Sequence, residues 1–171
     1  NYHRVIVAYS GGMDSHVLLH MTVQIVASYP KIGLSALHIN HQLQDAADEW
    51  AKHCANVCRQ LGVELTSVKV TIREDTGLGV EAAAREERYR VFSEHLQPGD
   101  LLLQAHHAND LVETFFLHLF RGSGPAGLAS IPETRACGLG VVARPFLSCT
   151  RTELLKYAQD NQLEWIEDPS N

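Results

Sequence analysis

The sequence predicts an α/β fold, in which a parallel sheet of about five strands is covered by helices on both faces. The first observation is that short apolar runs alternate with segments of helical length along the 171 residues. The second is that neither an internal repeat nor a low-complexity segment interrupts this alternation. The third is the length, which suits one domain with a hydrophobic core. Ligands of such folds bind at the carboxyl ends of the strands, so the residues that follow each strand are candidates for a site.

The N-terminal half is expected to hold three strands and the helices between them. The first strand reads RVIVAY and runs directly into a serine and two glycines, which indicates a tight turn before a helix. The third strand reads ELTSVKVTI, whose alternation and β-branched residues are typical of strands. The strands are expected at Arg4–Tyr9, Gly33–Asn40 and Glu64–Ile72. The helices are expected at Val17–Ile25 and through the stretch that holds Trp50 and Cys58.

The C-terminal half continues the same alternation. Apolar residues recur among charges over Gly79–Leu96, and Asn109–Phe120 is strongly apolar on one face, so both are expected to be helices. The segment between residues 121 and 130 is rich in glycine and is expected to be a loop. Further strands are expected at Asp100–Ala105 and Val141–Phe146, and a last amphipathic helix at Thr150–Gln162.

Composition and charge limit the classes of protein. No apolar run approaches the roughly 18 residues of a membrane span, and no signal segment opens the chain, so no membrane association is expected. The net charge of −6 by itself argues against a nucleic-acid-binding protein. None of the four cysteines forms a CxxC pair, and Cys54 and Cys58 are expected to be small buried residues. These features favour a reducing, cytoplasmic compartment.

The turn after the first strand is the clearest candidate binding site. Its sequence is Ser10-Gly11-Gly12-Met13-Asp14-Ser15, between a strand and a helix. Glycines allow the backbone to turn tightly, and the amides at a helix start then face an anion that the helix dipole also favours. The segment lacks the lysine of the GxxxxGK[ST] loop and is not a GxGxxG turn. A serine-capped helix start with turn glycines is the alternative without function.

The loop resembles the SGGxDS pyrophosphate loop of the ATP pyrophosphatase, or PP-loop, superfamily, whose fold is like that of the adenine nucleotide alpha-hydrolases. Later segments resemble tRNA(Ile)-lysidine synthetase, in order and over essentially the whole chain. They are His38–His41, Gly79–Tyr89, Ala105–Thr114, Arg121–Leu128, Arg144–Leu147 and Trp165–Asn171. The resemblance implies that residues 1–171 form a PP-loop ATP-binding catalytic domain, and that the chain is an N-terminal fragment whose basic tRNA-binding surface lies partly elsewhere.

The resemblance also implies a reaction in two steps. ATP adenylates the C2 oxygen of the wobble cytidine in an isoleucine tRNA with a CAU anticodon, and the amine of free L-lysine then displaces AMP. Ser10–Ser15 would bind the β and γ phosphates, and Asp14 would help to hold Mg²⁺, which prefers oxygen ligands. Arg85 is a catalytic candidate that would face the phosphates or the developing transition-state charge; it can also pair with Glu81 one helical turn away. A solvated ion pair is the alternative.

Candidate substrate-binding residues follow the fourth strand. Asp110 and Glu113 share one helix face and could hold the lysine ammonium group or, in the case of Asp110 as a catalytic residue, accept its proton. First-turn acids that complement the helix dipole are the alternative. The family often has two acids at positions 109 and 110, and Asn109 departs from that pattern. Arg121 opens a glycine-rich segment that suits an anion-binding or gating loop, or a plain connection.

Four histidines lie at or just after the ends of two of the expected strands: His38, His41, His106 and His107. A metal cluster is geometrically possible, but no HExxH-type spacing supports zinc. Contacts to ribose, base or phosphate, with His107 as a substrate-binding residue, or simple hydrogen bonds at strand ends remain as interpretations.

Three other functions remain possible at this point. A tRNA thiolase of the same superfamily usually carries CxxC pairs, which are absent here. A small-molecule synthetase of the GMP or NAD class shares the loop but not the later motifs. A nucleotide-binding sensor would perform no chemistry, and AMP release would separate it from an enzyme.

Overall fold

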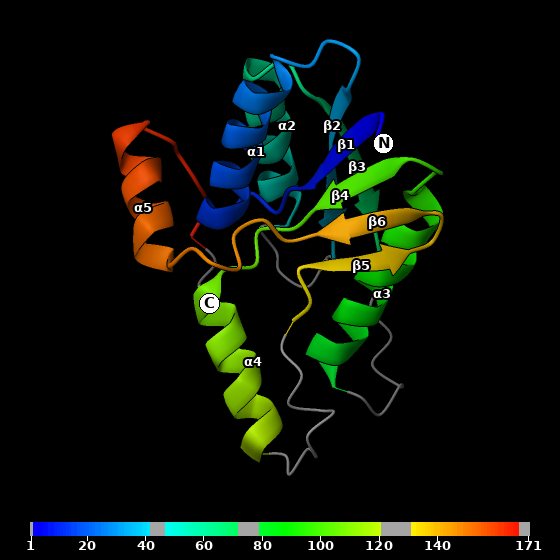
Figure 1. Cartoon of the computed structure of the whole chain (residues 1–171), viewed down its shortest axis with the longest axis vertical. Helices are drawn as coiled ribbons and strands as arrows, with labels where there is room; N and C mark the ends of the chain where they lie inside the picture. The colour runs from blue at the N-terminus through cyan, green and yellow to red at the C-terminus, as the bar shows by residue number, and fades with distance from the viewer. Residues whose placement is uncertain (1, 42–46, 72–78, 121–130, 168–171) are drawn as a thin grey trace.

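A computed structural model describes residues 2–41, 47–71, 79–120 and 131–167 of the chain. Its centre is a six-stranded sheet in the order β3-β2-β1-β4-β6-β5 (Figure 1). The strands are β1 Arg4–Ala8, β2 Gly33–Asn40, β3 Glu64–Lys69, β4 Asp100–Leu103, β5 Thr134–Cys137 and β6 Gly140–Ala143. The helices are α1 Met13–Val26, α2 Ala47–Gln60, α3 Val80–His95, α4 Ala108–Phe120 and α5 Arg151–Asp160. The predicted α/β fold with a mainly parallel sheet is confirmed.

The order of the strands places a crevice at the middle of the sheet. β1 pairs in parallel with β2 on one side and with β4 on the other. The chain therefore leaves β1 in one direction through β2 and β3, and returns to the other side through β4. Such a reversal is where doubly wound sheets bind ligands, because the loops after the two central strands diverge. Here those loops are the ones that follow β1 and β4.

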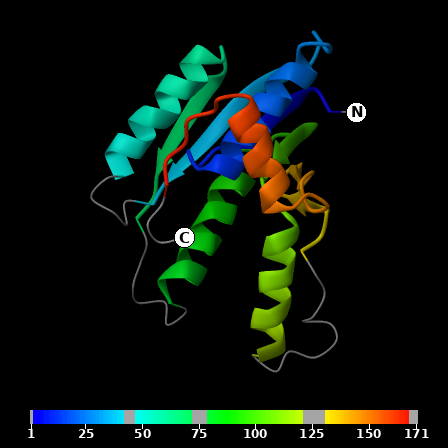
Figure 2. The same ribbon diagram turned by 90° about the vertical axis from the view of Figure 1, so that its left-hand side faces the viewer.

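Helices cover both faces of the sheet, as the apolar runs of its strands require. On one face α1, α2 and α5 pack together in a cluster that includes Val7, Val17, Cys54 and Ala158 (Figures 1 and 2). On the other face α3 packs through Phe92 against a second cluster from the strands. The loops that carry the site are thus held between two packed layers.

The sheet differs from the sequence-based prediction by one strand. β5 was not predicted, because its residues lack apolar alternation and three of the four are exposed. It pairs antiparallel with β6, and the two strands are joined by a short turn in which Gly138 has a φ of 54°. α1 begins at Met13, four positions before the first residue of the predicted helix, so the loop runs straight into it. The glycine-rich segment expected to be a loop lies outside the described residues.

Helix α4 extends away from the sheet (Figures 1 and 2). None of its residues is buried, so the apolar face predicted from its sequence is not covered by the described part of the chain. Its large exposed side chains are Val112, Phe115, Phe116, Leu117, Leu119 and Phe120. Among the described residues, no helix combines the length and apolar character that a membrane span requires.

Candidate active site

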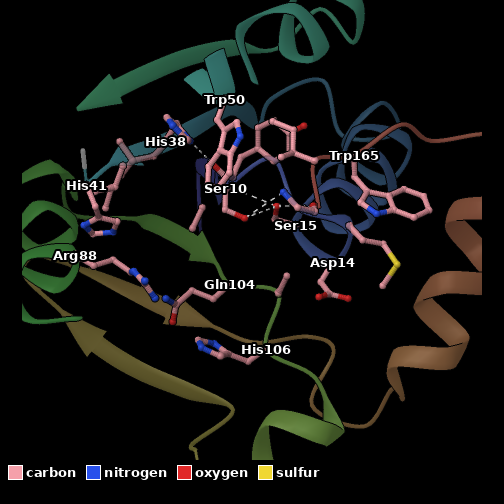
Figure 3. A pocket seen from close by; sticks show the side chains of 18 of the residues that line it. Ser10, Asp14, Ser15, His38, His41, Trp50, Arg88, Gln104, His106 and Trp165 are labelled. Atoms are coloured by element: carbon pink, nitrogen blue, oxygen red, sulfur yellow. Dashed lines mark hydrogen bonds between the residues drawn. The ribbon is translucent and has the colours of Figure 1, made fainter. Parts of the chain in front are cut away.

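A cavity of about 740 Å³ lies at the carboxyl ends of β1, β2 and β4. This volume falls within the range of small-molecule sites. Ser10 comes from the turn after β1, and Asp14 and Ser15 from the first turn of α1. His38 and His41 come from the end of β2, and Gln104 and His106 follow β4 (Figure 3). Arg88, Asp110, Arg151 and the segment Trp165–Glu167 also line the cavity.

The turn after β1 presents the uncapped start of α1 to the cavity. Gly12 is the N-cap residue, and no side chain caps the helix. The first amides of a helix have no partner within it, and its dipole is positive at this end, so the turn is suited to an anion. The Ser10 amide donates to the Ser15 hydroxyl at 3.2 Å, and the two hydroxyl oxygens lie 3.0 Å apart. These bonds fix the turn in shape before a ligand binds.

Gly11 has a backbone conformation that side chains rarely adopt. Its φ is 90°, and a Cβ atom added there would lie 2.9 Å from the Cys54 sulfur in α2. Its carbonyl accepts a hydrogen bond of 3.0 Å from the Ile166 amide, so the C-terminal segment fastens the same turn. Gly12 has a different role, because its φ of −76° suits any residue. An added Cβ there would meet its nearest neighbour, the Ser10 hydroxyl, at an ordinary 3.6 Å.

We expect Gly11→Ala to lower the free energy of unfolding by about 2 kcal/mol or more. The strain of a left-handed backbone and the steric cost of the close contact add together in this variant. Gly62→Ala is the matched control, since Gly62 has a φ of 68° but a Cβ there would meet no described atom within 4 Å. Its cost is expected to be about 1 kcal/mol. Urea denaturation of both variants measures the difference, and equal losses would contradict a tight approach of α2 to the turn.

Asp14 and Asp110 lie on opposite sides of one imidazole. The His107 Nε2 is 3.6 Å from an Asp14 carboxylate oxygen, and its Nδ1 is 3.4 Å from an Asp110 oxygen. Asp110 also accepts the His107 backbone amide at 2.7 Å, in the manner of a side chain that caps the start of α4. His107 is buried and is not part of the cavity wall, whereas both carboxylates are. The structure therefore brings three of the predicted site residues together.

The Asp14 carboxylate is suited to a cation. Burial raises the pKa of Asp14, even though His107 and Arg151 act to lower it. Its Oδ1 is buried and has no hydrogen-bond partner among the described residues. Mg²⁺ is usually held by one or two carboxylates together with phosphate oxygens, so this atom fits the ion beside a bound nucleotide. No group of three or more His, Cys, Asp or Glu side chains in the described ranges is placed to form a protein-only metal site.

His38 supports the cavity wall from the end of β2. Its Nδ1 lies 2.9 Å from the Tyr9 carbonyl, which can only accept, so Nδ1 carries the proton and Nε2 is an acceptor. Burial lowers the pKa of His38. Cys54, which lies 3.6 Å from the same Nδ1, is a free buried thiol, as is Cys58. The prediction that these two cysteines are small buried residues is confirmed.

His41 and His106 lie in the cavity wall as neutral rings. Burial, aided by Arg88 near His41 and by Arg144 near His106, lowers the pKa of each to about 4. As the pH falls from about 6.5, the unfolded chain binds protons on these rings that the folded chain does not bind, so the free energy of unfolding falls until about pH 4. We expect His106→Gln to reduce this dependence in urea titrations, with His118→Gln outside the cavity as the control. A dependence unchanged by His106→Gln would contradict the assignment.

The arginines of α3 are divided between the cavity and the surface. Arg88 lines the cavity, and burial together with Arg85 lowers the pKa of its guanidinium. Arg85 is exposed, is not part of the cavity wall, and has its guanidinium 5.3 Å from the centre of the Tyr89 ring. No ion pair joins Glu81 to Arg85 among the described residues. A phosphate-facing role of Arg85 stays a prediction.

The other predicted residues have different positions. Glu113 is exposed and does not line the cavity, and Arg121 lies outside the described residues. Asn109, which departs from the family pattern, accepts the Arg151 backbone amide at 3.1 Å and so joins the start of α4 to the start of α5. Gln104, Arg151 and Trp50 also line the cavity, and no motif in the sequence indicated a role for them. Only their places near strand and helix ends could have indicated them.

The chain is similar in sequence to tRNA(Ile)-lysidine synthases over most of its length. The tRNA(Ile)-lysidine synthase of Alkalilimnicola ehrlichii is 49% identical over 96% of the chain, and that of Pseudomonas aeruginosa is 48% identical over the same share. The chain spans 37% of the length of each of these relatives.

Solved structures show the same fold at lower identity. The U34-tRNA thiolase NcsA from Methanococcus maripaludis, solved with its [4Fe-4S] cluster, has a TM-score of 0.80 at 19% identity and covers 99% of this chain and 60% of its own. The NMN synthetase from Francisella tularensis has a TM-score of 0.59 at 11% identity, over 95% of this chain and 63% of its own. The PP-loop domain family matches residues 1–171, and by that match the chain belongs to this family.

Proposed function

We propose that the chain is the ATP-using catalytic domain of a tRNA(Ile)-lysidine synthase. The observation that carries the proposal is that the uncapped α1 turn and the Asp110 carboxylate open into one cavity. An anion site and an acidic site side by side suit an ATP-dependent reaction with an amine. The relatives that share almost half of its residues over 96% of the chain bear this name.

In the first step the turn would bind the nucleotide. The amides at the start of α1 would hold the β and γ phosphates, and Arg88 would face the phosphates from α3. Asp14 would bind Mg²⁺, which neutralises phosphate charge when it is present. The C2 oxygen of the wobble cytidine forms a bond to the α-phosphorus while the bond to pyrophosphate breaks. Pyrophosphate leaves with the electron pair, and an adenylated cytidine remains.

In the second step free L-lysine would replace AMP. An ammonium group is not a nucleophile, so the lysine amine must lose a proton before it attacks the C2 carbon. Asp110 lies in the cavity wall and is the carboxylate proposed to hold the ammonium group and accept that proton. The bond from carbon to the AMP oxygen then breaks. Asp110 is fixed in place by the His107 amide, which orients it toward the cavity side of α4.

The rival functions have weaker support. The thiolase neighbour was solved with a [4Fe-4S] cluster, whereas none of the four cysteines of this chain forms a CxxC pair. The NMN synthetase neighbour shares 11% of its residues with this chain and supports the fold alone. The free thiols are also consistent with the proposed reducing, cytoplasmic location.

The test is mass spectrometry of nucleosides from an isoleucine tRNA with a CAU anticodon, after incubation with the full-length protein, ATP and lysine. We expect a cytidine derivative whose mass exceeds that of cytidine by the mass of lysine less one water. Its formation should require the protein, ATP and lysine together. A sulfur-containing nucleoside, or a product that forms without lysine, would contradict it. Omission of Mg²⁺ is expected to abolish the product.

A further inference from the structure

The side chains of Arg144, Tyr89 and Gln104 form a hydrogen-bonded row that ends in the cavity wall. Arg144, which directly follows β6, donates from Nη2 to the Tyr89 hydroxyl at 2.8 Å. The Tyr89 hydroxyl in turn lies 3.2 Å from the Gln104 carbonyl oxygen at the end of β4. Arg144 is 1% exposed and Gln104 is 4% exposed. The row therefore joins a fully buried cation to an amide in the wall of the cavity.

The row has a fixed direction. A guanidinium has no acceptor, so the Tyr89 oxygen must accept the Arg144 proton. The hydroxyl hydrogen of Tyr89 is then left to donate, and it donates to the Gln104 carbonyl oxygen. The two ends of a glutamine amide can exchange places only if this bond is lost. The Gln104 NH₂ group is consequently held away from Tyr89, as a donor.

The surroundings of this NH₂ group indicate what it binds. Gln104 lines the cavity between Arg88 and His106 (Figure 3). Neither its NH₂ group nor the Arg88 guanidinium has a hydrogen bond or an ion pair with a described residue. Two donors, one of them positively charged, therefore line the cavity without an acceptor among the described residues. A neutral base carbonyl would leave the Arg88 charge unpaired, whereas a phosphate oxygen would satisfy both donors.

We propose that Gln104 donates a hydrogen bond to a phosphate oxygen of the bound nucleotide, and that Arg144 and Tyr89 act as positioning residues that hold its amide in the donating orientation. The proposal rests on the proposed function for the identity of the nucleotide, ATP. Where water cannot take the place of the donor, loss of a hydrogen bond to a charged group weakens ligand binding about tenfold or more. Arg144 does not touch the nucleotide and acts through Tyr89.

The first experiment measures ATP affinity by calorimetry in the full-length protein. Gln104→Met keeps the length of the side chain but removes both polar ends, and is expected to weaken ATP binding about tenfold. Gln104→Glu keeps the carbonyl oxygen near Tyr89 but replaces the donor with a negative charge, and is expected to weaken binding more. Gln159→Met, at an exposed position of α5, is the matched control. Unchanged ATP affinity in Gln104→Met would overturn the proposal.

A double-mutant cycle tests the positioning role. Tyr89→Phe removes the hydroxyl and should weaken ATP binding several-fold in the wild-type background. In the Gln104→Met background it should have no further effect, because the amide that it orients is gone. Equal losses in both backgrounds would overturn the row as a positioning device and indicate a general structural effect, which the melting temperatures would show separately. All readouts are ATP affinity, so a failure of lysidine formation would leave this test intact.

Discussion

Asp14→Asn is expected to lower the rate of tRNA adenylation by at least about a hundredfold, because loss of a charged ligand to the catalytic cation removes several kcal/mol of stabilisation. The Asp14 Oδ1 is buried in the cavity and has no hydrogen-bond partner among the described residues. The substitution therefore breaks no hydrogen bond between that atom and a described residue. Formation of adenylated tRNA from ATP labelled at the α-phosphate, at saturating Mg²⁺, measures the change.

The stability of the same variant should not fall. Burial raises the pKa of Asp14, which means that the folded protein disfavours its charged form. At neutral pH this carboxylate therefore lowers the free energy of unfolding, and asparagine removes that cost. A matched control is Asp48→Asn, because Asp48 is exposed and pairs with Lys69 at 2.9 Å outside the cavity. Normal adenylation by Asp14→Asn, or an equal loss in the control, would refute the role of Asp14.

Much of the site could be predicted from the sequence because parallel sheets align their carboxyl ends. Ser10–Ser15 and His106 follow strands and His38 lies near the end of β2, so the fold brings them to one cavity whatever the details of packing. Arg88 and Gln104 could not be chosen in this way. Which arginine of α3 faces the cavity depends on the rotation of the helix, and the helix carries charges on more than one face.

The net charge of −6 illustrates a different limit of sequence reasoning. Positive charge is concentrated around Tyr89, with the Arg85 and Arg135 guanidinium groups 5.3 and 4.9 Å from its ring centre. Arg144 bonds to the hydroxyl of the same ring. The electrostatic potential near the cavity depends on these nearby groups, because charges beyond about 10 Å are screened by salt. A negative total therefore does not exclude a polyanionic substrate.

Asp110→Asn is expected to slow lysine transfer about a hundredfold while adenylated tRNA still forms. Asparagine keeps an oxygen that can accept the His107 amide, so the start of α4 should persist, whereas alanine would remove both functions. Glu113→Gln is the paired comparison, since Glu113 shares the helix but is exposed and does not line the cavity. Its effect is expected to be several-fold smaller.

The two half-reactions must be followed separately, with ATP labelled at the α-phosphate and with labelled lysine. If Asp110 serves the amine, the adenylated tRNA accumulates in the variant and higher lysine concentrations restore part of the rate. If adenylation alone is lost and pre-adenylated tRNA still accepts lysine normally, Asp110 belongs to the nucleotide or cation site. That alternative is a real one, because His107 lies between Asp110 and Asp14 at 3.4 and 3.6 Å. The separate half-reactions therefore show whether Asp110 acts on the lysine amine or, with Asp14, at the nucleotide and cation.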